Sequence, residues 1–273
     1  MADAIGTSTG VARIEAVFAA SREEGRAALM PYMMGCFPDR EGAREVARSY
    51  AGAGADLVEV GIPFSDPLAD GTVIHAAATA ALSKGADLDA ALEACGELGE
   101  GIPSVAMCYV NMILALGPRR FAGRLAAAGA AGAIVPDLPL EESEEIDEAL
   151  AAEGLALVPL VAPTTPPDRR RRICEAARGF VYVVSVAGVT GEREEVPSHL
   201  AELVAAVKEE ASVPVAVGFG IGTPQQAAAV GEIADGVIVG TRLVRAVAES
   251  DGAAAGAEAA AAFIAEVRSA LEG

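Results

Sequence analysis

The sequence predicts an α/β fold, a (β/α)8 TIM barrel with one additional helix at its N-terminus. Eight short apolar segments alternate with helical segments over roughly 250 residues, which is the length and the repeat of such a barrel. The apolar segments are continuous runs rather than alternating ones, as expected for parallel strands that are covered on both faces. A doubly wound open sheet is the main alternative, but no GxGxxG motif follows the first apolar segment.

The pattern assigns the elements in chain order. Residues 10–27 place Val11, Ile14, Val17 and Phe18 on one side of an amphipathic helix, and this predicts the additional helix. Strands are expected at residues 28–34, 56–61, 103–109, 131–137, 155–161, 180–186, 213–219 and 235–240. Helices are expected near residues 40–53, 72–99 (as two helices), 118–128, 141–152, 167–178, 197–210, 224–231 and 257–271. We expect one domain over residues 1–273, with residues 1–9 flexible.

The composition excludes several classes of function. A net charge of −19 disfavours a nucleic-acid partner, because binding a polyanion needs clustered Lys and Arg, and the one basic run (169–172) is interpreted as a solvated helix face. No uncharged apolar run reaches the roughly 18 residues of a membrane span, and no secretory signal is visible, so no membrane partner is expected. Four cysteines without a CxxC pair indicate reduced thiols and a cytoplasmic protein.

Polar side chains collect where the predicted strands end, which is where barrel enzymes place their active sites. Glu59 ends the second strand, Asn111 follows the third, and Tyr182 lies within the sixth, with Thr190 in the loop beyond it. Asp137 ends the fourth strand but is interpreted as setting a turn or meeting a partner. The loops at 62–71 and 187–197 are the longest and richest in Gly and Pro, so they are expected to act as lids.

The segment VEVGIPFSDPLADG, residues 58–71, carries the strongest chemical signal. Glu59 lies near the end of a buried strand and Asp70 follows eleven residues later. If the loop folds back over the strand end, the two carboxylates form an acid/base pair. The alternative at this point is an acidic surface loop in a chain that has 39 acidic residues.

Three glycine-bearing turns follow the last three predicted strands, at residues 188–191, 218–224 and 240–242. Glycine allows the backbone to approach an anion closely, and the Thr241 hydroxyl can add a hydrogen bond. Loops at these positions of a barrel commonly hold phosphate. The pattern therefore predicts a phosphorylated small-molecule substrate.

Missing residue types narrow the chemistry. The only lysines, Lys84 and Lys208, fall on predicted helices away from strand ends, which disfavours Schiff-base and pyridoxal phosphate chemistry in this chain. The two histidines, His75 and His199, also fall on helices, so no metal site is expected. Carboxylate acid/base catalysis without a metal or a covalent cofactor remains. Carbon–carbon cleavage under those limits needs a substrate with its own electron sink, such as an indole ring.

The motifs together resemble the tryptophan synthase α subunit. The resemblance covers residues 12–270 and is carried by VEVGIPFSDPLADG, PDLPLEES, VAPTTP, SVAGVTG, VGFGIGTP and ADGVIVGTR. It implies cleavage of indole-3-glycerol phosphate to indole and glyceraldehyde 3-phosphate in L-tryptophan biosynthesis. It also implies an αββα heterotetramer with a β subunit, which alone would carry pyridoxal phosphate and would receive the indole.

The resemblance implies roles for individual residues. Glu59 is expected to be the general acid/base, Asp70 to bind the indole N–H, and Tyr182 to be the active-site tyrosine. The remaining positions are Tyr109 near the indole, Thr190 on the lid, the phosphate-binding residues Gly191, Phe219, Gly220, Gly240 and Thr241, and the β-facing residues Asp66, Pro67 and Asn111.

Several positions depart from the family pattern. Gly222 and Thr241 each stand where serine is usual, Met112 where proline is usual, and residues 35–39 replace a GDP-type turn. Two other functions stay open at this point. One is a barrel that serves mainly as an allosteric partner with negligible activity, and the other is a sugar-phosphate isomerase of amino-acid biosynthesis. The two acids count against the first, and the apolar first strand counts against the second.

Overall fold

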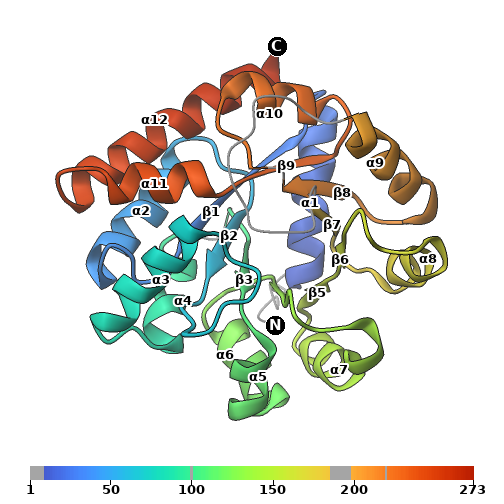
Figure 1. The fold of residues 1–273 in the computed structure, drawn as a ribbon, viewed down its shortest axis with the longest axis horizontal. Coiled ribbons are helices and arrows are strands. Elements are labelled where there is room, and N and C mark those ends of the chain that lie inside the picture. Colours follow the sequence, from blue (N-terminus) through green and yellow to red (C-terminus); the bar gives the residue numbers. More distant parts are fainter. Residues whose placement is uncertain (1–8, 99–100, 185–197, 219) are drawn as a thin grey trace, which may run out of the picture.

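The computed structural model describes residues 9–98, 101–184, 198–218 and 220–273. Figure 1 shows parallel strands on the inside and helices around them. Within the described residues the strands form one nine-stranded parallel sheet in the order β5-β4-β3-β2-β1-β9-β8-β7-β6. The strands are β1 Ala28–Met34, β2 Val58–Gly61, β3 Ser104–Met107, β4 Gly132–Ile134, β5 Ala156–Val158, β6 Leu160–Val161, β7 Val181–Val184, β8 Val215–Gly218 and β9 Gly236–Val239.

The strand expected at residues 155–161 is divided into β5 and β6 by Pro159. Proline has no N–H to give to a strand ladder, so the ladder changes partner at this residue. Before it, β5 pairs with β4, and after it β6 pairs with β7. The Pro159 carbonyl accepts a hydrogen bond from the Tyr182 N–H at 2.9 Å. The two ends of the sheet are thus joined through one residue, and the expected barrel is confirmed.

Apart from α1, the helices lie around the outside of the barrel, and they include two that the sequence pattern did not predict, α5 and α11. They are α1 Gly10–Glu23, α2 Arg40–Gly52, α3 Thr72–Ser83, α4 Leu88–Glu97, α5 Val110–Leu116, α6 Pro118–Ala127, η1 Leu140–Glu142 (a 3-10 turn), α7 Glu144–Ala152, α8 Pro167–Ala176, α9 Ser198–Glu210, α10 Pro224–Gly231, α11 Thr241–Ala248 and α12 Ala253–Glu272. Among them, no helix is both long and apolar enough to cross a membrane.

The additional N-terminal helix α1 packs against the interior of the barrel at its base. Thr9 caps it by accepting a hydrogen bond from the Ala12 N–H, and residues 1–8 lie outside the described residues. Ile14 and Phe18 are buried in one cluster with strand residues such as Met30, and the Phe18 ring lies 5.7 Å from that of Phe180. Because α1 fills this end, only the opposite end of the barrel offers room for a substrate.

Arg26, Arg268 and Asp56 form an ion-pair cluster at the base of the barrel. The Asp56 carboxylate accepts hydrogen bonds from Arg26 at 2.6 and 2.8 Å, from Arg268 at 3.0 Å, and from the Leu29 N–H at 2.7 Å. Only 3% of the Arg26 side chain and 14% of the Asp56 side chain are exposed. Since Arg268 belongs to α12, this cluster joins the last helix of the chain to its first two strands.

Candidate active site at the mouth of the barrel

Glu59 is a buried acid inside the barrel. It is the second residue of β2, where its neighbours Val58 and Val60 pack outward in the large cluster beneath the helices, while Leu57 packs into the interior. Alternate residues of a strand face opposite sides, so Glu59 faces the interior with Leu57. Its exposed fraction is 2%, and burial, with a further contribution from the charge of Asp70, raises its pKa to about 8. Glu59 therefore carries a proton at neutral pH.

Asp70 is brought to Glu59 by the loop after β2. The Tyr109 hydroxyl donates a hydrogen bond to Asp70 Oδ1 at 3.0 Å and accepts one from the Ala69 N–H at 3.1 Å. Burial raises the pKa of Asp70, whereas the Tyr109 hydrogen bond and the positive charge of His75 lower it. The two acids therefore stand in different surroundings, because Glu59 has no such hydrogen bond among the described residues.

Two further tyrosines lie near Glu59, one on the neighbouring strand β1 and one on β7. Tyr182 on β7 and Tyr32 on β1 are both buried, and burial is the main cause of their raised pKa values, to which the charge of Glu59 adds. A Cβ on Gly61 would lie 2.0 Å from the Tyr32 hydroxyl, and one on Gly218 would lie 2.4 Å from the Tyr182 hydroxyl. These two strand ends therefore need glycine to make room for the phenols.

Tyr32 is the site residue that the sequence analysis missed. Its strand, ALMPYMM, is as apolar as the other strands, so the sequence pattern does not distinguish this tyrosine from a core residue. In the register of β1 and β2, Tyr32 pairs with Glu59. Two features of the sequence could have indicated Tyr32: it carries the only hydroxyl in the apolar run 28–34, and the next strand, β2, ends in Gly61.

One of the turns expected to bind phosphate, the turn after β9, lies beside Tyr32. Gly240 caps α11, and a Cβ on it would lie 3.6 Å from that of Tyr32. Thr241 is buried at the first position of α11, where backbone N–H groups lack intrahelical partners. Gly220 has φ +76°, a left-handed conformation that favours glycine. Thr190, Gly191 and Phe219 lie outside the described residues, as does the expected lid at 187–197.

The side chains near these turns already have partners within the protein. Gln226 Oε1 accepts hydrogen bonds from the N–H groups of Gly222 at 2.8 Å and Thr223 at 3.1 Å, at the start of α10. Arg242 lies over the Phe263 ring, 4.9 Å from its centroid, so its charge points toward α12. What α11 offers an anion is therefore its backbone and the Thr241 hydroxyl.

The residues expected to face a partner lie on the outer side of the mouth. Asp66 and Asn111 are exposed and Pro67 is half-buried. Two large apolar side chains stand out beside them, Leu68 with 89% exposure and Leu114 with 58%.

Asp137 holds the start of the helix that carries Asn111 and Leu114. Its Oδ1 accepts a hydrogen bond from the Val110 N–H, the first residue of α5, at 2.9 Å. This agrees with its interpretation as a residue that sets a turn.

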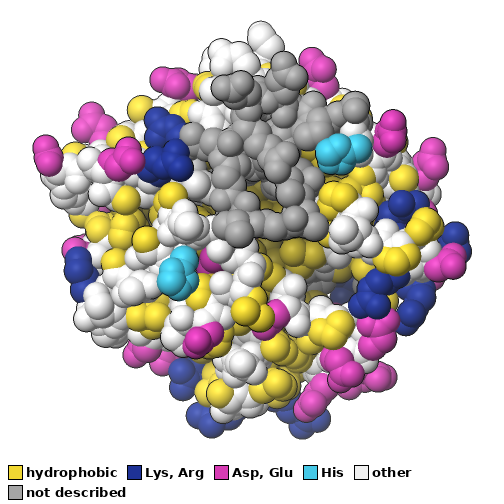
Figure 2. Space-filling model, in the orientation of Figure 1, with side chains coloured by type: hydrophobic (Ala, Val, Ile, Leu, Met, Phe, Trp, Pro, Cys, Tyr) yellow, Lys and Arg dark blue, Asp and Glu magenta, His cyan; other side chains and the backbone are white. Residues whose placement is uncertain are grey.

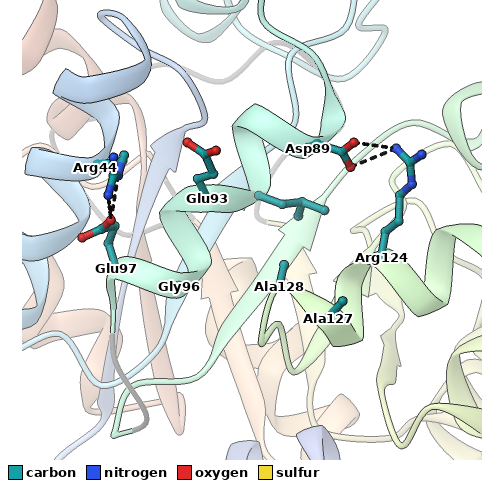
Figure 3. A pocket seen from close by; sticks show the side chains of 9 residues that line it. Arg44, Asp89, Glu93, Gly96, Glu97, Arg124, Ala127 and Ala128 are labelled. Atoms are coloured by element: carbon teal, nitrogen blue, oxygen red, sulfur yellow. Dashed lines mark hydrogen bonds and ion pairs between the residues drawn. The ribbon is translucent and has the colours of Figure 1, made fainter.

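Charged side chains outside the mouth form ion pairs on the surface. Figure 2 shows acidic and basic side chains mainly around the periphery of one face. A groove between α4 and α6 has this character: Arg44 donates to Glu97 at 2.6 Å and Arg124 to Asp89 at 2.9 Å (Figure 3). Among the described residues, no group of three or more His, Cys, Asp or Glu side chains could hold a metal ion.

Comparison with known proteins agrees with this geometry. The family model described as tryptophan synthase alpha chain matches residues 18–272. The tryptophan synthase alpha chain of Carboxydothermus hydrogenoformans is 48% identical over 236 residues, covering 86% of this chain and 88% of the relative. That of Synechococcus sp. (strain CC9902) is 48% identical over 254 residues, covering 92% and 94%. A structure of Mycobacterium tuberculosis tryptophan synthase superposes with a TM-score of 0.89 at 36% identity, covering 97% of this chain and 99% of that one. The chain therefore belongs to the tryptophan synthase alpha chain family.

Proposed function

We propose that the mouth of this barrel cleaves indole-3-glycerol phosphate and that Glu59 and Asp70 are the two acids responsible. Alpha chains of this family are lyases that release indole and glyceraldehyde 3-phosphate in tryptophan biosynthesis. The observation that supports the assignment is the pair itself: a neutral Glu59 and a hydrogen-bonded Asp70 in one buried space. Two acids with different surroundings can take different roles in one reaction.

The protonated Glu59 would supply the proton that starts the cleavage. Its proton would pass to ring carbon 3 of the indole, and the ring would become a cation. The carboxylate left on Glu59 would then accept the proton of the hydroxyl next to the breaking bond. The electrons of that bond would return to the ring, so that indole and an aldehyde leave and Glu59 is neutral again.

Asp70 would bind the indole N–H and stabilise the positive charge that develops on the ring. Stabilising that charge requires the carboxylate form, which burial disfavours and which the Tyr109 hydroxyl and His75 favour. Tyr182 would pack against the substrate beside Glu59. The phosphate would lie on Gly220, Gly240 and Thr241, together with Gly191 and Phe219, and Thr190 would close over the site.

A β subunit would dock on the exposed surface beside the mouth, in an αββα heterotetramer. Asp66, Pro67 and Asn111 would face it, and the exposed Leu68 and Leu114 support an apolar contact there. Tyr109 connects this surface to the acids. Its hydroxyl bonds to Asp70 and to the Ala69 N–H, next to Leu68, and the residue itself immediately precedes α5. Alpha chains of this family need no cofactor, since the pyridoxal phosphate belongs to the β subunit.

We further infer that the chain forms a single domain and that the protein is cytoplasmic. One sheet that runs from residue 28 to residue 239 supports the first inference. Four free cysteines, Cys36, Cys95, Cys108 and Cys174, support the second.

The experiment that tests the proposal is steady-state cleavage of indole-3-glycerol phosphate by Glu59→Gln, with and without a β subunit. We expect kcat to fall by about 10³-fold while KM stays close to that of the wild type, since glutamine keeps the shape but cannot transfer the proton. Asp66→Asn, on the same loop and exposed, is the matched control and should keep its kcat in the absence of the β subunit. Near-full turnover by Glu59→Gln would contradict the acid/base assignment.

A further inference from the structure

The Tyr32 hydroxyl is a strong donor without a strong acceptor. Among the described residues, its hydrogen-bond acceptor is the sulfur of Met34, at 4.0 Å. The hydroxyls of Tyr109 and Tyr50 are better satisfied. Tyr109 makes two hydrogen bonds at 3.0 and 3.1 Å, and the Tyr50 hydroxyl donates to the Tyr32 carbonyl at 3.3 Å. A buried hydroxyl with so weak a partner calls for an explanation, because buried polar groups are normally hydrogen-bonded.

The position of this hydroxyl is fixed by the sheet. Tyr32 and Glu59 are register partners on neighbouring parallel strands, so their side chains project from the same face. The phenol then extends along β2 until its hydroxyl lies over Gly61, where a Cβ would be only 2.0 Å away. After burial, the groups that raise the pKa of the phenol are Asp70, Glu59, Tyr109 and Tyr182. Its oxygen therefore lies among the acids of the site.

Glu59 needs a donor at one point of the reaction. In the resting protein it is neutral, and no described residue donates a hydrogen bond to its carboxyl group. Once it has given its proton to the indole ring, a carboxylate is left in a fully buried position. Such a charge is costly unless a donor reaches it.

We propose that Tyr32 is a positioning residue for Glu59, and that its hydroxyl donates a hydrogen bond to the Glu59 carboxylate formed after proton transfer to the substrate. This inference rests on the proposed role of Glu59. The step moves no further proton: Tyr32 exchanges its weak sulfur acceptor for a carboxylate oxygen and keeps its own proton. Burial and the neighbouring acids raise the pKa of Tyr32 well above its ordinary value, which favours a donor that does not ionise.

The other groups around Glu59 do not fill this role equally. Asp70 comes from the loop after β2 and raises the pKa of Glu59, so it disfavours a carboxylate at that position. Tyr109 is already engaged with Asp70 and Ala69. Tyr182 faces Glu59 from β7 and is the one other phenol within reach of its charge, but its strand is not a neighbour of β2 in the sheet.

The test compares Tyr32→Phe with Tyr50→Phe, by kcat, KM, pH profile and thermal unfolding. For Tyr32→Phe we expect kcat to fall about tenfold with little change in KM. The limb of the kcat profile that reports Glu59 should move to higher pH, because the carboxylate has lost a donor. The unfolding temperature should stay the same or rise, since the hydroxyl has only a weak partner in the resting protein.

Tyr50→Phe is the matched control, because it removes an equally buried hydroxyl that is bonded to backbone. We expect it to lower the unfolding temperature and to leave kcat and the pH profile unchanged. Two results would overturn the proposal. One is a Tyr32→Phe variant with the kcat and pH profile of the wild type, and the other is a fall in kcat with a lower unfolding temperature and an unshifted profile. Either result would leave the role of Glu59 standing, since that role is decided separately by Glu59→Gln.

Discussion

Asp56 lies just before β2 and Glu59 lies within it, and the two acids have opposite surroundings. Asp56, at the base, accepts hydrogen bonds from two arginines and one backbone N–H. Glu59, at the mouth, is buried without a donor among the described residues and keeps its proton instead. The hydrogen-bond partners of a buried acid, and not its residue type, decide whether it stabilises the fold or remains available for chemistry.

The two ends also differ in what closes them. At the base, α1 fills the barrel and Arg268 brings in α12, so that distant parts of the chain meet there. At the mouth, glycines 61 and 218 leave space that two phenols occupy. Barrel enzymes commonly separate stability and activity in this way.

The largest effect on stability should come from disrupting the cluster of Asp56, Arg26 and Arg268 at the base of the barrel. Asp56→Asn keeps the shape of the side chain but removes the buried carboxylate, so that among the described residues Arg26 and Arg268 keep only the more exposed carboxylates of Glu24 and Glu272. We expect the free energy of unfolding to fall by about 3 kcal/mol, as when one partner of a buried ion pair is removed. Urea denaturation would measure this, and kcat per folded molecule should not change.

Asp89→Asn is the control for that prediction, because Asp89 pairs with Arg124 on the surface, with 65% and 40% of the side chains exposed. Its effect on the free energy of unfolding should be within about 0.5 kcal/mol. If Asp56→Asn were as stable as Asp89→Asn, the cluster at the base would not have the role assigned to it.

A smaller effect should come from the partner of Asp70 at the mouth. Tyr109→Phe keeps the ring that stacks on Phe64 but removes the hydrogen bond that lowers the pKa of Asp70. The pKa of Asp70 should then rise, so the low-pH limb of the kcat/KM profile should move to higher pH. Near that limb we expect kcat/KM for indole-3-glycerol phosphate to fall about tenfold. An unmoved limb would show that Tyr109 does not govern the ionisation of Asp70.

Most of the fold could be predicted from the sequence, because parallel strands leave a plain signal. The continuous apolar runs marked every strand, although Pro159 divides one of them. Helix α5 was missed because its seven residues, VNMILAL, continue the apolar run of the strand before it. Helix α11 was missed because its amphipathic pattern spans only eight residues. The start of α12 is rich in alanine and gives no periodic signal.

The site was less predictable, because its properties depend on contacts between distant residues. The motif around Glu59 and Asp70 pointed to two acids, but not to the burial that keeps one of them neutral. No spacing in the sequence shows that Tyr32 lies opposite Glu59, or that Arg26, Asp56 and Arg268 meet. These relations follow from strand register and helix packing, which a local pattern does not contain.

Glu59 is neutral in the folded protein at neutral pH, and the pH dependence of the free energy of unfolding reports this protonation state. In the unfolded chain Glu59 loses its proton near pH 4.5, whereas in the folded protein it keeps the proton up to about pH 8. Wild-type stability should therefore decrease through this range, and that of Glu59→Gln should not share the loss. We predict that the stability advantage of Glu59→Gln grows by at least about 1 kcal/mol from the lower pH to the higher. A constant difference, or one that shrinks as the pH rises, would mean that Glu59 is ionised in the folded state and would contradict the account.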